Sequence, residues 1–171
     1  MNLFMVVLRL IHIGAGVFGA GGAIIVARFV IPSVQDAGPE GGKVVQALQK
    51  RGLMTALPAA AVLSMVAGLI LYWRDSAGSA SAFSQSPSGI ALSLGAAVSI
   101  VAFVIGITIM RPSTMKAGAL AQTLPELTDP AARTARQAEI QGLRTRAARA
   151  ANWVAGLLGL AVAAMAVARY L

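Results

Sequence analysis

The chain has 171 residues, of which 57% are hydrophobic and 12% charged, and its mean hydropathy is +0.76. A soluble domain usually carries about 25% charged residues, so this composition indicates an integral membrane protein. With no cysteine and one histidine, the chain cannot form disulfide frameworks, iron–sulfur clusters, thiolate zinc sites or a metal site of several imidazoles. The net charge of +8 comes from basic residues beside apolar segments, so we expect contact with anionic lipid and no nucleic-acid partner.

Four apolar segments are long enough to cross a bilayer, which takes about 20 helical residues. The expected fold is therefore all-α, a membrane four-helix bundle in which residues 1–171 form a single membrane domain. The first segment has no basic side chain ahead of it and is too long for a signal peptide, so we expect it to be retained. The predicted spans cover residues 3–31, 53–73, 89–110 and 150–168.

The segments between the spans carry their own signals. Pro32 is expected to end the first helix, because proline interrupts helical hydrogen bonding. Residues 43–51 predict a short amphipathic helix at the lipid interface, with an apolar face made of Val44, Val45 and Leu48.

The second span contains Pro58, which predicts a kink, and ends in an interface anchor of Tyr72, Trp73 and Arg74. Residues 75–88 are rich in Ser, Ala and Gly and predict an exposed loop. The third span is expected to stop at Arg111-Pro112, before a polar segment.

Asp129 and Pro130 form a typical helix start, and no helix breaker follows them before the C-terminus. Residues 130–149 therefore predict a basic cytoplasmic helix that continues into the fourth span. Its arginines are Arg133, Arg136, Arg144, Arg146 and Arg149.

Charge distribution predicts the orientation, since basic loops stay in the cytoplasm. Of the 14 Lys and Arg residues, only Arg9, Arg74 and Arg169 fall outside the loops 33–51 and 112–150 and their borders. We expect a multi-pass protein of the bacterial inner membrane with both termini on the non-cytoplasmic side.

Small residues are dense in the first and fourth spans, where they permit close approach of helices. Tight packing of the four helices, with a dimer face, explains them in one interpretation. In the other, a large flat ligand lies against the first helix. The small residues concerned are Gly14, Ala15, Gly16, Gly19, Ala20, Gly21, Gly22 and Ala23 in the first span, and Ala151, Ala155, Gly156, Gly159 and Ala163 in the fourth.

His12 is the candidate for chemistry. At helical spacing it shares a face with Arg9, Gly16 and Gly19. Haem b in a membrane bundle needs an axial imidazole, room for the porphyrin and a cation for a propionate. His12 would supply the imidazole, as ligand of the haem iron, Gly16 and Gly19 the room, and Arg9 the cation.

Two alternatives remain open for His12: a hydrogen bond to another helix without any ligand, and a proton relay. No catalytic residue is predicted, because no serine has a base beside it and no carboxylate lies at mid-membrane. A second axial ligand would come from a symmetry mate's histidine, from another subunit, or from Met54, Met65, Met110 or Met165.

The stretch from Leu10 through His12, Gly16 and Phe18 to Gly22 resembles the opening of a group of bacterial membrane proteins. These are uncharacterised four-helix integral membrane proteins related to the copper-resistance D (CopD) type. The segments 68–74, 146–152 and 165–171 are similar to the same group. More distantly, the first helix resembles that of HemJ-like proteins, and this resemblance implies haem ligation by His12. Gly19 stands where tryptophan is usual, which implies a widened slot or a protein interface.

Three functions therefore follow as alternatives. The first is a haem b-binding protein associated with membrane redox or haem chemistry. The second is a non-catalytic accessory or assembly subunit, either a homodimer or packed against other membrane-protein subunits. The third is copper handling, which is implied by the CopD resemblance. Under each of these alternatives, we expect the chain to assist other proteins rather than to catalyse a reaction itself.

Overall fold

The computed structural model of the chain describes residues 2–76 and 80–171. Within these ranges the ordered elements are helices, and there is no strand. Four helices are long and apolar enough to cross a membrane: Leu3–Asp36, Leu53–Asp75, Pro87–Glu126 and Pro130–Tyr170. The chain is therefore all-α, and its four candidate spans indicate a multi-pass membrane protein.

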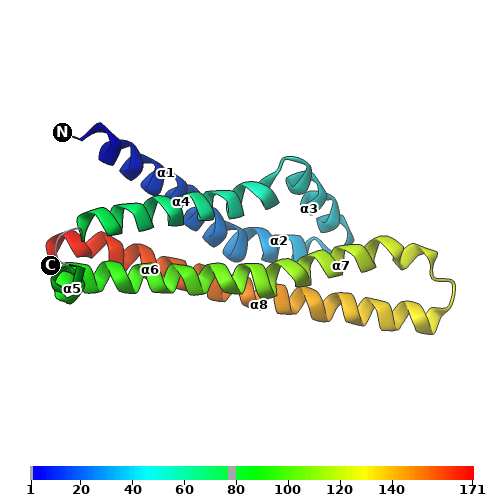
Figure 1. Cartoon of the computed structure of the whole chain (residues 1–171). Helices are drawn as coiled ribbons and strands as arrows, with labels where there is room; N and C mark the ends of the chain where they lie inside the picture. Colours follow the sequence, from blue (N-terminus) through cyan, green and yellow to red (C-terminus); the bar gives the residue numbers. More distant parts are fainter. Residues whose placement is uncertain (1, 77–79) are drawn as a thin grey trace.

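The long helices form two antiparallel hairpins (Figure 1). In the first, α1 (Leu3–Ile25) packs mainly on α4 (Leu53–Asp75). In the second, α6 (Pro87–Ile105) packs mainly on α8 (Pro130–Val167). The two hairpins meet where the helix that begins as α1 reaches α8, through a buried cluster of Ala27, Ala151 and Ala155.

Pro32 and Pro112, which were expected at helix ends, lie inside long helices instead. The prediction that Pro32 ends the first helix is wrong, because a π-helical turn, Val26–Val30, leads directly into α2 (Ile31–Asp36). The third long helix also continues past Arg111-Pro112, with a π-helical turn, Gly106–Met110, before α7 (Arg111–Thr123). Proline lacks an N–H and crowds the preceding turn, and the wider π turn accommodates both effects.

The connections between long helices are also helical. The segment expected as an interfacial helix is α3 (Gly41–Lys50), which lies beside α2 (Figure 1). The predicted loop 75–88 contains a short helix, α5 (Ala80–Gln85), so the loop prediction is wrong there. Residues 77–79 of that loop lie outside the described residues.

Tyr72 is tied into the bundle rather than serving only as a surface anchor. Its hydroxyl shares a 2.7 Å hydrogen bond with the Ser93 hydroxyl on α6, and its ring meets Phe83 edge-on at 5.4 Å between centroids. By contrast, the neighbouring Trp73 is 73% exposed.

From Ile140 onward, the helix α8 buries a residue at every seventh position. These residues are Ile140, Ala147, Val154, Ala161 and Ala168, the last of which lies in the closing 3-10 turn. Seven residues make two helical turns, so the buried positions form one continuous seam. The same packing face therefore serves both the arginine-rich half and the apolar half of α8.

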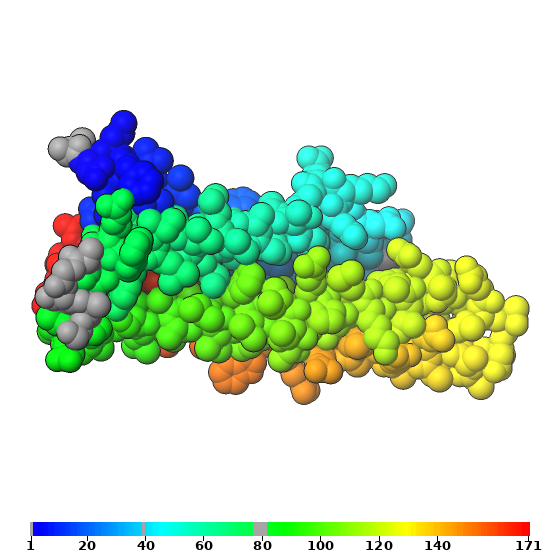
Figure 2. All heavy atoms as spheres, viewed as in Figure 1, coloured from blue at the N-terminus to red at the C-terminus, as the bar shows by residue number. Residues whose placement is uncertain are grey.

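The polar segment after the third predicted span continues the third long helix and packs along the first half of α8. It consists of α7 followed by the 3-10 turn Leu124–Glu126. The Lys116 ammonium lies 2.8 Å from the Glu139 carboxylate, which joins α7 to α8. Figure 2 shows this α7–α8 hairpin extending beyond α3 at one end of the molecule.

Candidate functional site at His12

His12 lies at the α1–α4 interface, where it is held by a reciprocal pair of hydrogen bonds. Its Nδ1 lies 2.8 Å from the Ser64 carbonyl oxygen, and the Ser64 hydroxyl donates to the His12 carbonyl oxygen at 3.0 Å. Because a carbonyl oxygen only accepts, Nδ1 carries the proton in this contact. We call this arrangement the His12–Ser64 clasp.

Two glycines make room for the clasp. A Cβ at Gly68 would lie 2.7 Å from Cε1 and 2.9 Å from Nδ1 of His12. A Cβ at Gly16 would lie 3.1 Å from the Ser64 hydroxyl oxygen. Because α1 and α4 are antiparallel, His12 lies over Gly68, which follows Ser64 by four residues. In the same way, Ser64 lies over Gly16, which follows His12 by four residues.

The same close approach continues along the glycine face of α1. Gly19 is buried against Ala60 and Ala61, and a Cβ there would lie 3.6 Å from the Ala61 nitrogen. A Cβ at Gly22 would lie 2.5 Å from Cδ2 of Leu57. The space along Gly16 and Gly19 is thus filled by α4, and this packing does not fit a porphyrin between them.

Arg9, the expected partner of a propionate, has a carboxylate of the chain itself beside it. Its guanidinium lies 3.9 Å from the Asp75 carboxylate at the end of α4, and both side chains are substantially exposed. The Arg74 guanidinium stacks 5.7 Å from the centroid of the Phe4 ring at the same end. An exposed ion pair stabilises little, so these contacts mark the end of the α1–α4 hairpin rather than a prepared anion site.

The methionines considered as second ligands are distributed over the bundle. Met110 packs against the Ala27 cluster, and Met165 packs against Gly95 on α6. Met54 is 43% exposed near the start of α4, about 15 Å along the helix from Ser64. Met65 follows Ser64 directly. In the part of the chain that the structure describes, no group of three or more His, Asp or Glu side chains could hold a metal ion.

Sequence reasoning missed Ser64 and Gly68, the partners of His12. The available signal was spacing: His12 precedes Gly16 by four residues, and Ser64 precedes Gly68 by four. Two such pairs on antiparallel helices place each polar residue opposite a glycine when the registers match. Small and hydroxyl residues at membrane-helix interfaces are typical of close helix packing.

Comparison with known proteins found no matching family model, no matching curated protein and no matching solved structure. The resemblance to CopD-like and HemJ-like proteins therefore stays a prediction that depends on the segments quoted for it.

Proposed function

We propose that this protein is a non-catalytic accessory subunit of a membrane complex, in which the bundle is the anchor and the α7–α8 hairpin is the docking element. One observation carries the proposal. An ion pair joins the two helices of the hairpin, and the cations along its outer faces are available to bind another molecule.

That ion pair uses the carboxylate at the centre of the hairpin. Glu139 lies 2.8 Å from the Lys116 ammonium and 3.8 Å from the Arg136 guanidinium. By contrast, the side chains of Arg133 and Arg144 are exposed, and their guanidiniums have no ion-pair or hydrogen-bond partner within the described ranges. A rigid helix pair with free guanidiniums suits an acidic surface on a partner protein.

The location follows from charge bias, and it is part of the proposal. The membrane is the bacterial inner membrane, both termini lie on the non-cytoplasmic side, and the hairpin lies in the cytoplasm. There it would be accessible to a cytoplasmic domain of another subunit, or to a second copy of this chain.

Native electrophoresis of membranes solubilised in a mild detergent tests the docking proposal. The wild-type chain is expected to migrate in a discrete complex larger than its detergent-bound monomer. Arg133→Glu with Arg144→Glu should release the chain from that complex, while Arg133→Lys with Arg144→Lys should retain it. A wild-type monomer in native membranes, or equal migration of the two double variants, would contradict the proposal. Co-expression of two differently tagged copies distinguishes a homodimer from a complex with another subunit.

Haem ligation by His12 is the second candidate, and one feature favours it. Donation from Nδ1 to the Ser64 carbonyl leaves Nε2 of the neutral ring with its lone pair. Such a nitrogen is able to bind iron. Because α4 fills the space along Gly16 and Gly19, a porphyrin would have to lie outside the α1–α4 interface.

The visible spectrum of protein purified from a haem-replete host tests this candidate. A Soret band that shifts on reduction and disappears in His12→Ala would establish haem ligation. Ser64→Ala is the matched control, because it removes the hydroxyl and keeps both the carbonyl and the imidazole. A colourless wild-type preparation would refute haem binding and would leave the docking proposal standing.

A further inference from the structure

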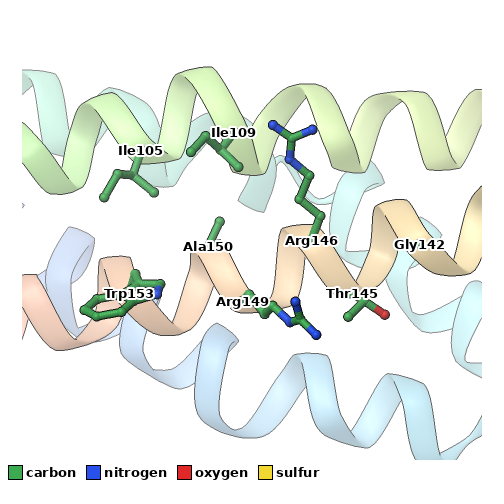
Figure 3. A pocket seen from close by; sticks show the side chains of 8 residues that line it. All are labelled: Ile105, Ile109, Gly142, Thr145, Arg146, Arg149, Ala150 and Trp153. Carbon is green, nitrogen blue, oxygen red and sulfur yellow. The ribbon is translucent and has the colours of Figure 1, made fainter.

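A hollow between α6 and α8 combines cationic and apolar walls (Figure 3). We call it the α6–α8 groove. Its volume is about 740 Å³, and it is open to the outside. One wall carries Ile105 and Ile109, and the other carries Arg146, Arg149, Ala150 and Trp153.

The groove lies where both helices change character. Arg149 is the last arginine of the basic half of α8, and Trp153 lies about 6 Å further along the helix in the apolar half. On the opposite wall, Ile105 and Ile109 belong to the apolar stretch that ends just before Arg111. The hollow thus has a cationic end and an apolar end, side by side.

The two guanidiniums at the cationic end are available to a ligand. Arg146 and Arg149 are exposed, and neither guanidinium has a hydrogen-bond or ion-pair partner among residues 2–76 and 80–171. The nearest acidic residue along α8 is Glu139, whose carboxylate is engaged by Lys116 and Arg136. Figure 3 shows the Arg146 guanidinium extending toward the wall of Ile105 and Ile109, and the Arg149 guanidinium extending to the other side of α8. Both belong to the groove lining and neither charge is neutralised there, so an anion in the groove would be bound favourably.

We propose that the α6–α8 groove binds one anionic phospholipid. Its phosphodiester would pair with the Arg146 guanidinium, since guanidinium matches phosphate geometry and pairs with two of its oxygens. Arg149, the second cation of the lining, would add to the attraction through its charge. Its acyl chains would lie along Ile105 and Ile109. Trp153, which is 70% exposed, would lie at the level of the glycerol and headgroup, where tryptophan is enriched. Basic pockets between membrane helices bind such headgroups.

The groove beside α3 is a natural contrast. Its volume is about 320 Å³, and its lining of Phe29, Val30, Ser33, Val34, Val44 and Leu48 contains no charged residue. Apolar chains can lie there, but nothing in that lining distinguishes one headgroup charge from another. Selection for a negative headgroup therefore belongs to the α6–α8 groove.

Native mass spectrometry of the purified full-length chain in detergent tests the proposal. Phosphatidylglycerol and phosphatidylcholine with identical acyl chains are the probes, and the number and affinity of retained lipids are measured. We expect one phosphatidylglycerol to be retained with a preference of about tenfold or more over phosphatidylcholine. Arg146→Gln with Arg149→Gln should abolish that preference.

The matched control is Arg133→Gln with Arg144→Gln, which removes two cations from the same helix but not from the groove lining. This variant should keep the preference. Circular dichroism and size-exclusion profiles check that both double variants stay folded. Equal retention of the two lipids, no change in Arg146→Gln with Arg149→Gln, or an equal loss in the control would overturn the proposal. Displacement of the lipid by glycerol phosphate would also overturn it, because the site would then bind a soluble anion.

A fluorescence measurement tests the same proposal without altering the arginines. Trp73 and Trp153 are the two tryptophans of the chain, so Trp73→Phe leaves Trp153 as the single reporter. Brominated phosphatidylglycerol should quench Trp153 at a concentration about tenfold lower than brominated phosphatidylcholine. Quenching at the same concentration would contradict a selective site beside Trp153.

Discussion

At the scale of single residues, the glycines of the α1–α4 interface are not equivalent. A Cβ at Gly68 would meet the His12 ring at 2.7 Å, whereas nothing lies within 4 Å of a Cβ at Gly21. Gly68 therefore sets how closely the imidazole can approach α4. A side chain at Gly21 would instead enter open space.

Gly68→Ala is expected to destabilise the bundle. The added methyl group would push the ring away from the Ser64 carbonyl, and such overpacking typically costs about 1–3 kcal/mol. Unfolding in mixed detergent, followed by circular dichroism, measures the change in the free energy of unfolding.

Gly21→Ala is the matched control. Alanine is the better helix former by about 1 kcal/mol, so stability should stay unchanged or rise slightly. Equal destabilisation by the two substitutions would mean that loss of glycine, rather than contact with His12, is responsible.

The His12–Ser64 clasp also shows how far sequence reasoning can reach at this scale. His12 stands out as the one imidazole of the chain, and its sharing of a helix face with Gly16 and Gly19 follows from helical spacing. Its partner could not be inferred, because Ser64 is 52 residues away and local spacing does not fix the register between two helices. The small residues of the first span are consistent both with close packing of helices and with a slot for a flat ligand.

At the scale of the helix, the buried seam of α8 should tolerate larger side chains poorly. Ala161 is 2% exposed, and its carbonyl oxygen would lie 3.2 Å from a Cβ at Gly95 on α6. Ala161→Leu should therefore lower the free energy of unfolding by about 1–3 kcal/mol. Ala163→Leu, two residues further on and exposed, should change it by no more than about 0.5 kcal/mol. Thermal unfolding of the two variants side by side decides whether the seam packs as described.

The α7–α8 hairpin should respond to pH through Glu139. A hydrogen bond from Lys116, aided by the charges of Lys116 and Arg136, holds the pKa of Glu139 below its ordinary value of 4.5. A lowered pKa stabilises the folded hairpin at pH above 4.5, and this contribution is lost as pH falls through the lowered value.

Hydrogen exchange of α7 amides, corrected for intrinsic rates, measures that response. Protection should be constant from neutral pH down to about 4.5 and should decrease below it. Glu139→Gln should show reduced protection at neutral pH and no such decrease. A decrease of the same size in Glu139→Gln would assign it to other carboxylates. The effect is small in any case, because the pair is exposed.

Proline shows where local rules fail at this scale. The rule that proline ends a helix predicted ends at Pro32 and Arg111-Pro112, yet both helices continue through a π-helical turn. The adjoining turns have packing partners: Ala27 lies in the buried cluster with Ala151 and Ala155, and Ser113 and Ala117 of α7 are buried. Such tertiary packing offsets the local cost of proline, and it is invisible in a local sequence window.

At the scale of the whole molecule, composition was sufficient for the class of fold but not for its assembly. Apolar length alone predicts four long helices, and the part of the chain that the structure describes contains four of sufficient length. The pairing into hairpins and the contact between the hairpins depend on the clasp, the seam of α8 and the Ala27 cluster, which join residues far apart in the chain. The two ends of the resulting bundle differ strongly in positive charge.

That charge difference gives the last prediction, the orientation in the membrane. The chain has no cysteine, so each single-cysteine variant carries one thiol that reports its own position. Gln85 and Gln49 are exposed and lie outside the four predicted spans, on α5 and α3 respectively. If basic segments stay in the cytoplasm, a membrane-impermeant maleimide should label Gln85→Cys in intact spheroplasts. Gln49→Cys should be labelled only after the membrane is permeabilised.

The reverse pattern would place the α7–α8 hairpin outside the cytoplasm and would remove the basis for a cytoplasmic docking role. Labelling of both variants before permeabilisation would mean that the chain does not cross the membrane as proposed.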